Sequence, residues 1–230
     1  MDSRQAELFE QFEADARSAL AVFGLDVAVL HDFGELVDIF ARRNPEMQDP
    51  VNPTYNPARR SISADSFWLK ATDRDGALVG TYAMTIERSG DLLADMLGGG
   101  LWYDAGLPED WSRMAPVVVG PATSVRGPYS HAGAVFIEPA WRKYGVGREL
   151  ARIARATTLR VPGLEFVTGF ILEALASRNA GQRLYGYPPG SVDLILSGYW
   201  PVVQRDVRLY LCHMPAGQAL NLMSAELRAA

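Results

Sequence analysis

A short run of arginine and glycine in the second half of the chain has the residue types and spacing of an anion-binding loop. Gly145 and Gly147 follow Arg142 at spacings of three and five residues. Glycines have no Cβ, so successive backbone N–H groups can converge on one anion. The helix that is predicted to start there adds unsatisfied N–H donors and the positive end of its dipole. The run therefore predicts a pyrophosphate cradle at the point where a strand becomes a helix.

Three ligand classes use loops of this kind, and two of them do not fit this sequence. The nucleoside triphosphate loop needs Gly-x-x-x-x-Gly-Lys-Ser/Thr, which the chain lacks. The dinucleotide loop needs a third small residue, but Leu150 stands at that position. The third pattern is Arg/Gln-x-x-Gly-x-Gly/Ala after a strand that ends in proline. The run Arg142-Lys-Tyr-Gly145-Val-Gly147 fits it at every position, behind a predicted strand at 134–138 and Pro139.

This pattern resembles the GNAT superfamily of N-acyltransferases, in which the loop holds the pyrophosphate of coenzyme A. The resemblance implies an α/β (α+β) fold with a mixed, largely antiparallel central sheet, splayed at the coenzyme site and flanked by helices. It also implies acetyl-CoA as the co-substrate and no metal. The residues that it assigns to coenzyme binding are Phe136, Ile137, Glu138, Arg142, Lys143, Tyr144, Gly145, Val146, Gly147, Arg148 and Asn179, the first three through their backbone groups to the pantetheine arm.

The segment from Asn179 to Tyr187 resembles the next motif of that family, in which an asparagine contacts the pantetheine arm and a tyrosine protonates the departing thiolate. Tyr185 takes that role by the resemblance, since a tyrosine is neutral at pH 7 and can donate to a thiolate whose pKa is about 8.5. The Asn179–Tyr185 spacing is one residue shorter than the common form, so Tyr187, or no acid at all, stays open. Glu138 is the candidate base, and a water chain is the alternative.

Composition and charge exclude several classes of protein. Of the 230 residues, 48% are hydrophobic and 21% charged, as in ordinary globular proteins. A single cysteine, Cys212, indicates a reducing compartment, and we expect a cytoplasmic protein. His31, His131 and His213 are too scattered in sequence to predict a metal site. The net charge of −5 argues against nucleic-acid binding, and the lack of a long apolar run argues against a membrane span and a signal peptide.

Periodicity predicts a single acyltransferase domain over 1–230, with an N-terminal helical extension at 1–23, an insertion at 88–131 and a C-terminal helix at 214–230. Predicted helices cover 3–22, 32–43, 177–184 and 216–228, and a further helix follows the glycine loop with Leu150, Ile153, Ala154 and Thr157 on one face and Arg148, Arg152 and Arg155 on the other. Predicted strands cover 26–30, 67–72, 77–87, 116–119, 134–138, 165–172 and 206–213.

Two irregular segments are candidates for the acceptor side. Residues 44–64 hold four prolines and predict a long loop on the substrate side. The aromatic residues of 88–131 either shape an acceptor pocket or form a small satellite core. Asp95 and Asp104 are unranked acceptor-side acids in that insertion.

The sequence therefore favours an acyl-CoA-dependent N-acyltransferase, which transfers acetyl from acetyl-CoA to a small-molecule amine or a peptide by direct attack in a ternary complex. Dimers are common among such proteins, so the resemblance leaves a homodimer open. Two alternatives remain. One is a transferase of longer acyl chains, and the other is a non-catalytic coenzyme A-binding or interaction module, which the short Asn179–Tyr185 spacing motivates.

Overall fold

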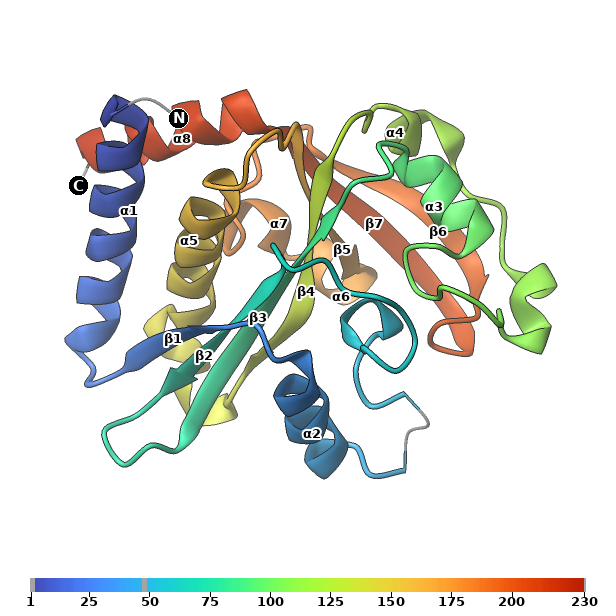
Figure 1. Ribbon diagram of the computed structural model, residues 1–230, viewed down its shortest axis with the longest axis horizontal. Helices are drawn as coiled ribbons and strands as arrows, with labels where there is room; N and C mark the ends of the chain where they lie inside the picture. The colour runs from blue at the N-terminus through green and yellow to red at the C-terminus, as the bar shows by residue number, and fades with distance from the viewer. Residues whose placement is uncertain (1–2, 47–48, 230) are drawn as a thin grey trace.

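The computed structural model describes residues 3–46 and 49–229. Within these residues, seven strands form one sheet in the order β1-β2-β3-β4-β5-β7-β6, with helices on both faces (Figure 1). The strands are β1 (Asp26–Leu30), β2 (Phe67–Thr72), β3 (Leu78–Glu87), β4 (Tyr129–Ile137), β5 (Phe166–Leu172), β6 (Val192–Trp200) and β7 (Arg205–Pro215). Among them, only β4 and β5 pair in parallel. The predicted fold class, a mixed and largely antiparallel sheet flanked by helices, is confirmed.

The helices include one near each end of the described chain, as the sequence predicts. They are α1 (Ser3–Ala21), α2 (Phe33–Arg43), α3 (Leu92–Gly98), α4 (Val119–Thr123), α5 (Val146–Leu159), α6 (Glu173–Ala176), α7 (Ala180–Arg183) and α8 (Ala216–Ala229), with short 3-10 turns η1 (Pro53–Tyr55), η2 (Glu109–Arg113) and η3 (Pro139–Tyr144). Residues 1–2 and 230 of the predicted extensions lie outside the described residues. In the described part of the chain, no helix is both long and apolar enough to cross a membrane.

Three segments differ from the sequence prediction. Of the strand expected at 116–119, only Val117 forms a β-bridge, with Leu196, because the chain turns into α4 directly afterwards. Of the helix expected at 177–184, only Ala180–Arg183 is helical (α7), because Asn179 before it has a left-handed φ of 54°; the short helix α6 ends at Ala176, before that range. Strand β6 has no counterpart among the predicted strands, since a serine and a glycine interrupt its apolar alternation.

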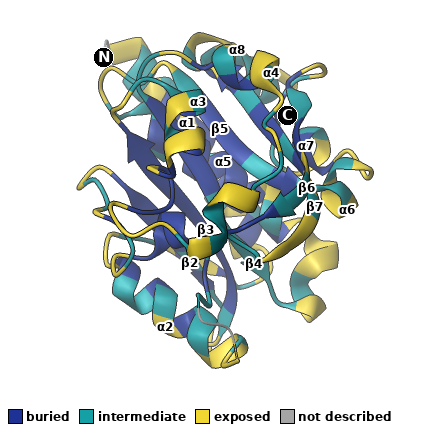
Figure 2. Cartoon of the chain, turned by 90° about the vertical axis from the view of Figure 1, so that its right-hand side faces the viewer, coloured by how far each residue is buried: buried dark blue, intermediate teal, exposed yellow. Residues whose placement is uncertain are grey.

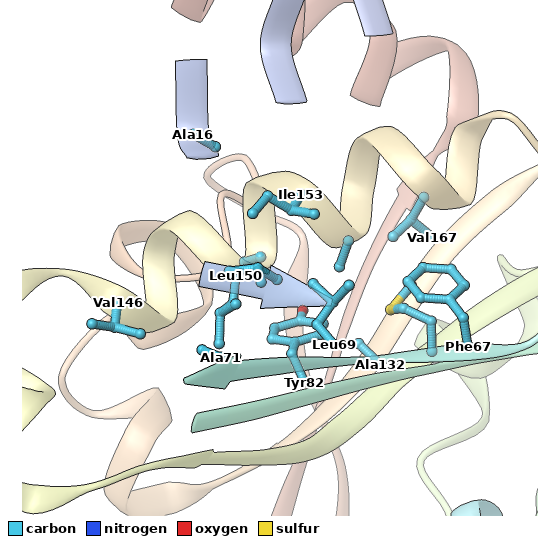
Figure 3. Close-up of a cluster of buried hydrophobic side chains, with 14 of the residues drawn as sticks. Ala16, Phe67, Leu69, Ala71, Tyr82, Ala132, Val146, Leu150, Ile153 and Val167 are labelled. Atoms are coloured by element: carbon cyan, nitrogen blue, oxygen red, sulfur yellow. The ribbon is translucent and has the colours of Figure 1, made fainter. Parts of the chain in front are cut away.

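Helix α5 packs across one face of the sheet and covers the largest apolar cluster (Figure 3). Leu150 and Ile153 of this helix share the cluster with Leu69 of β2 and Tyr82 of β3, and all four are buried. The strands form the buried interior, whereas exposed residues gather on helices and loops around it (Figure 2). The predicted apolar face of the helix after the glycine loop is therefore confirmed for Leu150, Ile153 and Ala154.

Two of the three arginines on the polar face of α5 are covered rather than exposed. Arg152 and Arg155 are only 6% and 3% exposed, because α1 and α8 pack over them. Arg152 donates to Glu149 at 2.8 Å and to Asp15 of α1 at 2.7 Å. Its guanidinium also lies 4.4 Å from the ring centre of Phe12. The amphipathic pattern alone predicts an outward polar face; here the terminal helices bury it and supply carboxylates to its arginines.

The burial of α1 leads to a prediction about stability. Phe12 is 0% exposed and belongs to the apolar cluster that joins α1, α5 and α8. We expect Phe12→Ala to lower the free energy of unfolding by about 3–5 kcal/mol, because it removes apolar burial and leaves a cavity. The matched control is Phe23→Ala, at a ring that is 42% exposed, where we expect a loss of about 1 kcal/mol or less. Denaturant unfolding measures both, and equal losses would contradict the packing of α1.

Candidate functional site

The centre of the sheet opens where β4 and β5 part. Their parallel ladder joins Tyr129–Ala132 to Phe166–Gly169, and no described residue continues it further. Just beyond, Ala134 has a φ of 44°, and the register between β3 and β4 shifts. Thr81 of β3 donates its hydroxyl to the Ala134 carbonyl at 2.8 Å. A bulge of this kind bends one strand away from its neighbour and leaves part of the ladder unpaired.

A cavity of about 230 Å³ lies in the gap between the parted strands. Its lining combines backbone of both strands with apolar and aromatic side chains: Tyr82, Ala132, Gly133, Ala134, Val135, Gly169, Phe170, Ile171, Leu172, Leu175, Tyr185, Tyr187 and Cys212. Gly133 leaves room for a neighbour, since a Cβ at this position would overlap the ring of Tyr55. A gap of this shape accepts an extended chain that pairs with exposed strand edges.

The backbone of β4 presents alternate residues to the gap. The N–H of Glu138 donates to the Val79 carbonyl on β3 at 2.8 Å, so it faces away from β5. Backbone groups alternate along an antiparallel ladder, so Phe136 also faces β3, whereas Ile137 and Val135 face the gap. Of the three residues predicted to meet the pantetheine arm, Ile137 is therefore well placed. Val135, which the sequence prediction does not include, lines the cavity and shares this backbone orientation with Ile137.

The side chains at the end of β4 are tied to α2. Arg43, the last residue of α2, forms an ion pair with Glu138, the predicted base. The same guanidinium lies 4.0 Å from the ring centre of Phe136. From the other side, Arg142 Nε donates to the Ile137 carbonyl at 3.0 Å. The Glu138 carboxylate is thus already engaged, and the Ile137 carbonyl already has a donor.

The predicted glycine loop lies directly at the start of α5. Gly145 has a φ of 74° and occupies the N-cap position, after Arg142, Lys143 and Tyr144 in η3. The Arg148 N–H donates to the Gly145 carbonyl at 2.9 Å. Helix geometry leaves the N–H groups of the first two helical residues, Val146 and Gly147, without an intrahelical partner. These donors and the helix dipole make the start of α5 a candidate anion site next to the gap.

An arginine-lined hollow of about 400 Å³ lies beside α5 and α7. Its lining residues are Asp15, Arg148, Arg152, Arg155, Gln182, Arg183, Leu184, Gly186, Glu226 and Ala229. Arg148 is exposed and also contacts Glu149 at 2.9 Å. Asn179, the remaining predicted coenzyme contact, is exposed at the N-cap of α7, and its side chain makes no capping hydrogen bond. It stands apart from the cavity lining.

Both tyrosines that the sequence offers as the acid line the cavity. Burial raises the pKa of Tyr185 to about 12 and raises the pKa of Tyr187 well above its ordinary value. Burial also raises the pKa of the Cys212 thiol, which lines the same cavity, to about 12. Both phenols are therefore neutral donors at pH 7. Tyr187 is buried and Tyr185 only partly so, which leaves Tyr185 the more accessible.

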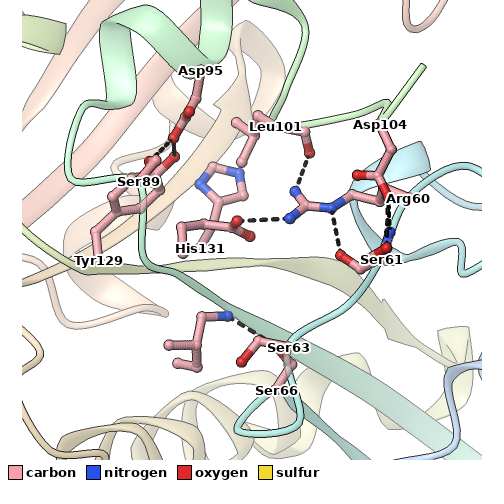
Figure 4. A network of polar contacts seen from close by, with 12 residues as sticks. Arg60, Ser61, Ser63, Ser66, Ser89, Asp95, Leu101, Asp104, Tyr129 and His131 are labelled. Carbon is pink, nitrogen blue, oxygen red and sulfur yellow. Dashed lines mark hydrogen bonds and ion pairs between the residues drawn. The ribbon is translucent and has the colours of Figure 1, made fainter. Parts of the chain in front are cut away.

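Asp95 and Asp104 take part in a polar network of the insertion rather than in the cavity (Figure 4). Asp95 accepts from the hydroxyl of Tyr129 at 2.5 Å and from that of Ser89. Asp104 accepts from the Ser61 N–H at 2.6 Å and from its hydroxyl at 2.7 Å, and these bonds lower the pKa of Asp104. Both carboxylates hold loops in place.

The same network contains a buried ion pair that the sequence did not indicate. Arg60 donates to Glu87 at 2.7 Å and to the Leu101 carbonyl at 2.7 Å, which joins the 44–64 loop to β3 and to the insertion. His131 is buried beside it and bonded to Thr168 at 3.0 Å, and burial together with Arg60 lowers its pKa to about 3. Among residues 3–46 and 49–229, no group of three or more His, Cys, Asp or Glu side chains could hold a metal.

The aromatic residues of the insertion form a second core. Trp102 is fully buried, with ring centres of Trp111 at 5.5 Å and Trp200 at 6.0 Å. Phe170 lies 6.3 Å from Trp102 and also lines the cavity. Of the two alternatives left open by the sequence, the satellite core is the one observed for Trp102.

No protein-family model and no curated protein sequence matches the chain. Solved structures do. The chain resembles N-acetyltransferases. Arabidopsis thaliana NAA60 in complex with acetyl-CoA has a TM-score of 0.49 and 13% identity over 84% of this chain and 99% of that one. A GCN5-related N-acetyltransferase from Kribbella flavida has a TM-score of 0.45 and 18% identity over 84% and 98%.

The ribosomal-protein-S18-alanine N-acetyltransferase from Escherichia coli has a TM-score of 0.46 and 10% identity, over 84% of this chain and 94% of that one. Structures named as GNAT-family acetyltransferases, such as one from Streptococcus pneumoniae, are also similar. This is the family that the sequence resembles. All of these identities are below 20%, so the likeness is one of fold.

The two loop glycines should respond differently to alanine. Gly145 is left-handed, whereas a Cβ on Gly147 would meet only Ile137, at 3.6 Å. We expect Gly145→Ala to cost about 1–2 kcal/mol of unfolding free energy, because left-handed backbone strains any residue with a Cβ. Gly147→Ala should stay within about 0.5 kcal/mol, since the contact is ordinary. Urea unfolding compares them, and a Gly147→Ala loss as large as that of Gly145→Ala would refute the assigned loop conformation.

Proposed function

We propose that the chain is an acyl-CoA-dependent N-acyltransferase that acts as one domain and transfers acetyl from acetyl-CoA to an amine. The observation that carries this proposal is the junction of two features: the gap between β4 and β5, and the anion site at the start of α5. An extended pantetheine arm in the gap would pair with Val135 and Ile137. Its pyrophosphate would then meet the N–H groups of Val146 and Gly147.

The proposed chemistry is a direct attack on the thioester. The amine nitrogen forms a bond to the acetyl carbon, and the carbon–sulfur bond breaks with its electron pair on sulfur. Tyr185 donates its hydroxyl hydrogen to that sulfur as it leaves. A free thiol of pKa about 8.5 would be a poor match for a phenol of pKa about 12. Burial in the same cavity raises the pKa of Cys212 to about 12. The coenzyme thiolate would be desolvated in the same way, so its pKa would rise toward that of Tyr185.

The attacking nitrogen must also lose a proton. Glu138 is the candidate base at the end of β4, but its carboxylate is paired with Arg43. We therefore assign this proton to water in the gap, with Glu138 and Arg43 orienting the end of the strand. The acceptor is an amine on a small molecule or a peptide. A longer acyl chain would need room among the aromatic residues of 88–131, and the place of Trp102 in the second core favours acetyl.

Coenzyme binding is tested by calorimetric titration with acetyl-CoA. We expect micromolar binding by the native chain and at least a tenfold weaker Kd in Gly147→Asp, about 1.4 kcal/mol or more, because a carboxylate would stand against the pyrophosphate. Gly147→Ala is the matched control and should bind like the native chain. If the native chain does not bind acetyl-CoA at millimolar concentration, the proposal fails.

Catalysis is tested separately with a panel of amines and acetyl-CoA. We expect Tyr185→Phe to keep the Kd for acetyl-CoA and to lower turnover by about 10²–10⁴-fold, the usual contribution of general acid catalysis. Tyr187→Phe is the comparison that decides between the two tyrosines. Binding without transfer to any amine would favour the non-catalytic coenzyme A-binding alternative, and equal rates with long-chain donors would contradict the acetyl assignment.

A further inference from the structure

A buried arginine of α5 reaches the turn that carries the two cavity tyrosines. Arg155 is 3% exposed. Its Nη2 donates to the Tyr185 carbonyl at 2.9 Å, and its Nη1 donates to Glu226 of α8 at 3.0 Å. The space for the guanidinium comes from Gly186, where an added Cβ would overlap it. Gly186 also has a left-handed φ of 66°, which allows the chain to turn between the tyrosines.

Burying an arginine only to hydrogen-bond one carbonyl is energetically unfavourable. Desolvating a guanidinium costs several kcal/mol unless hydrogen bonds and a counter-charge offset it. Arg155 has one carboxylate partner, and Glu226 lies partly exposed on α8. The apolar packing of α5 does not need this charge, because Leu150 and Ile153 already bury its other face. Packing therefore does not account for a buried arginine at this position, and its hydrogen bond to the Tyr185 carbonyl points to another role.

The backbone of the tyrosine turn has few other restraints. The Tyr185 N–H donates to the Ala180 carbonyl at 3.2 Å, and the Tyr187 N–H donates to the Gly181 carbonyl at 2.9 Å. Both of these bonds reach back to α7. The bond from Arg155 is the one that joins the turn to α5, whose first turn is the proposed pyrophosphate site.

We propose that Arg155 is a positioning residue that fixes the Tyr185 hydroxyl relative to the coenzyme thiol by holding the Tyr185 carbonyl against α5. This inference rests on the proposed function. Glu226, which lies on α8, neutralises the charge of the Arg155 guanidinium. The helix that binds the pyrophosphate thereby also sets the place of the acid. The C-terminal helix, far from the reacting atoms in sequence, becomes coupled to catalysis.

The test is a double-mutant cycle between Arg155→Gln and Tyr185→Phe. Arg155→Gln should lower kcat by about a hundredfold, as a displaced catalytic group does, and leave the Kd for acetyl-CoA within about threefold. In the Tyr185→Phe background it should cause little further loss, because residues that act as a unit are not additive. Arg160→Gln is the matched control, since Arg160 ends the same helix and pairs with Glu13. Equal losses in both backgrounds would overturn the proposal.

A second readout does not need an acceptor. Tyr185 becomes a phenolate as the pH rises through its pKa, about 12 in this structure, and only the protonated form can donate. If Arg155→Gln frees the turn, the phenol becomes more exposed and its pKa falls toward the ordinary value of about 10. The phenolate absorbance of Arg155→Gln minus that of Arg155→Gln/Tyr185→Phe reports this shift directly. Phenolate formation at the same pH as in the native chain would contradict the positioning role.

Two further comparisons keep the outcomes separate. If Arg155→Gln does not fold, Glu226→Gln removes the partly exposed carboxylate, which also pairs with Arg152 Nε at 3.4 Å. It should lower kcat and the pH of phenolate formation in the same direction by a smaller amount. If the native chain transfers acetyl to no amine, the proposed function fails, while the phenolate measurement still decides whether Arg155 holds Tyr185. Native transfer with an additive Arg155→Gln loss would instead leave the function standing and remove the inference.

Discussion

The parting of β4 and β5 is the constraint on which the rest of the site depends. A parallel ladder that stops at Ala132 and Gly169 leaves backbone donors and acceptors without strand partners in the middle of a sheet. Such groups are costly to bury unpaired. At the bulge, the Thr81 hydroxyl donates to the Ala134 carbonyl, and Arg142 donates to the Ile137 carbonyl. The groups that remain face a cavity, so the gap is maintained by the surrounding structure and suits a ligand with its own amide groups.

Helix α5 connects this gap to the rest of the molecule. One face packs on the sheet, its first turn presents free N–H groups beside the gap, and its arginine face lies under α1 and α8. The carboxylates of Asp15 and Glu226 reach those arginines from the two terminal helices. The ends of the chain thus fix the helix that presents the anion site. This coupling explains why a helix with so polar a face is buried on both sides.

The sequence predicted those parts whose physics is local. The neighbouring strands at 67–72 and 77–87, the helix that begins near Asp32 and the glycine loop before α5 each depend on neighbouring residues, and all three appear in the structure. Features decided by distant packing were not predictable in this way. The burial of Arg152 requires α1, and β6 pairs along its length with β7.

The candidate site shows the same division. The candidate anion site at the start of α5 could be predicted from Arg142 to Gly147, because glycine spacing dictates backbone geometry. The residues facing the gap could not all be predicted, since a β-bulge at Ala134 decides which backbone groups turn toward β5. The proposed acid, Tyr185, lies in a desolvated cavity, and burial raises its pKa and that of Cys212 together. The parted strands that would admit the proposed ligand also create this low-dielectric environment, in which the pKa values of a phenol and a thiol can be similar.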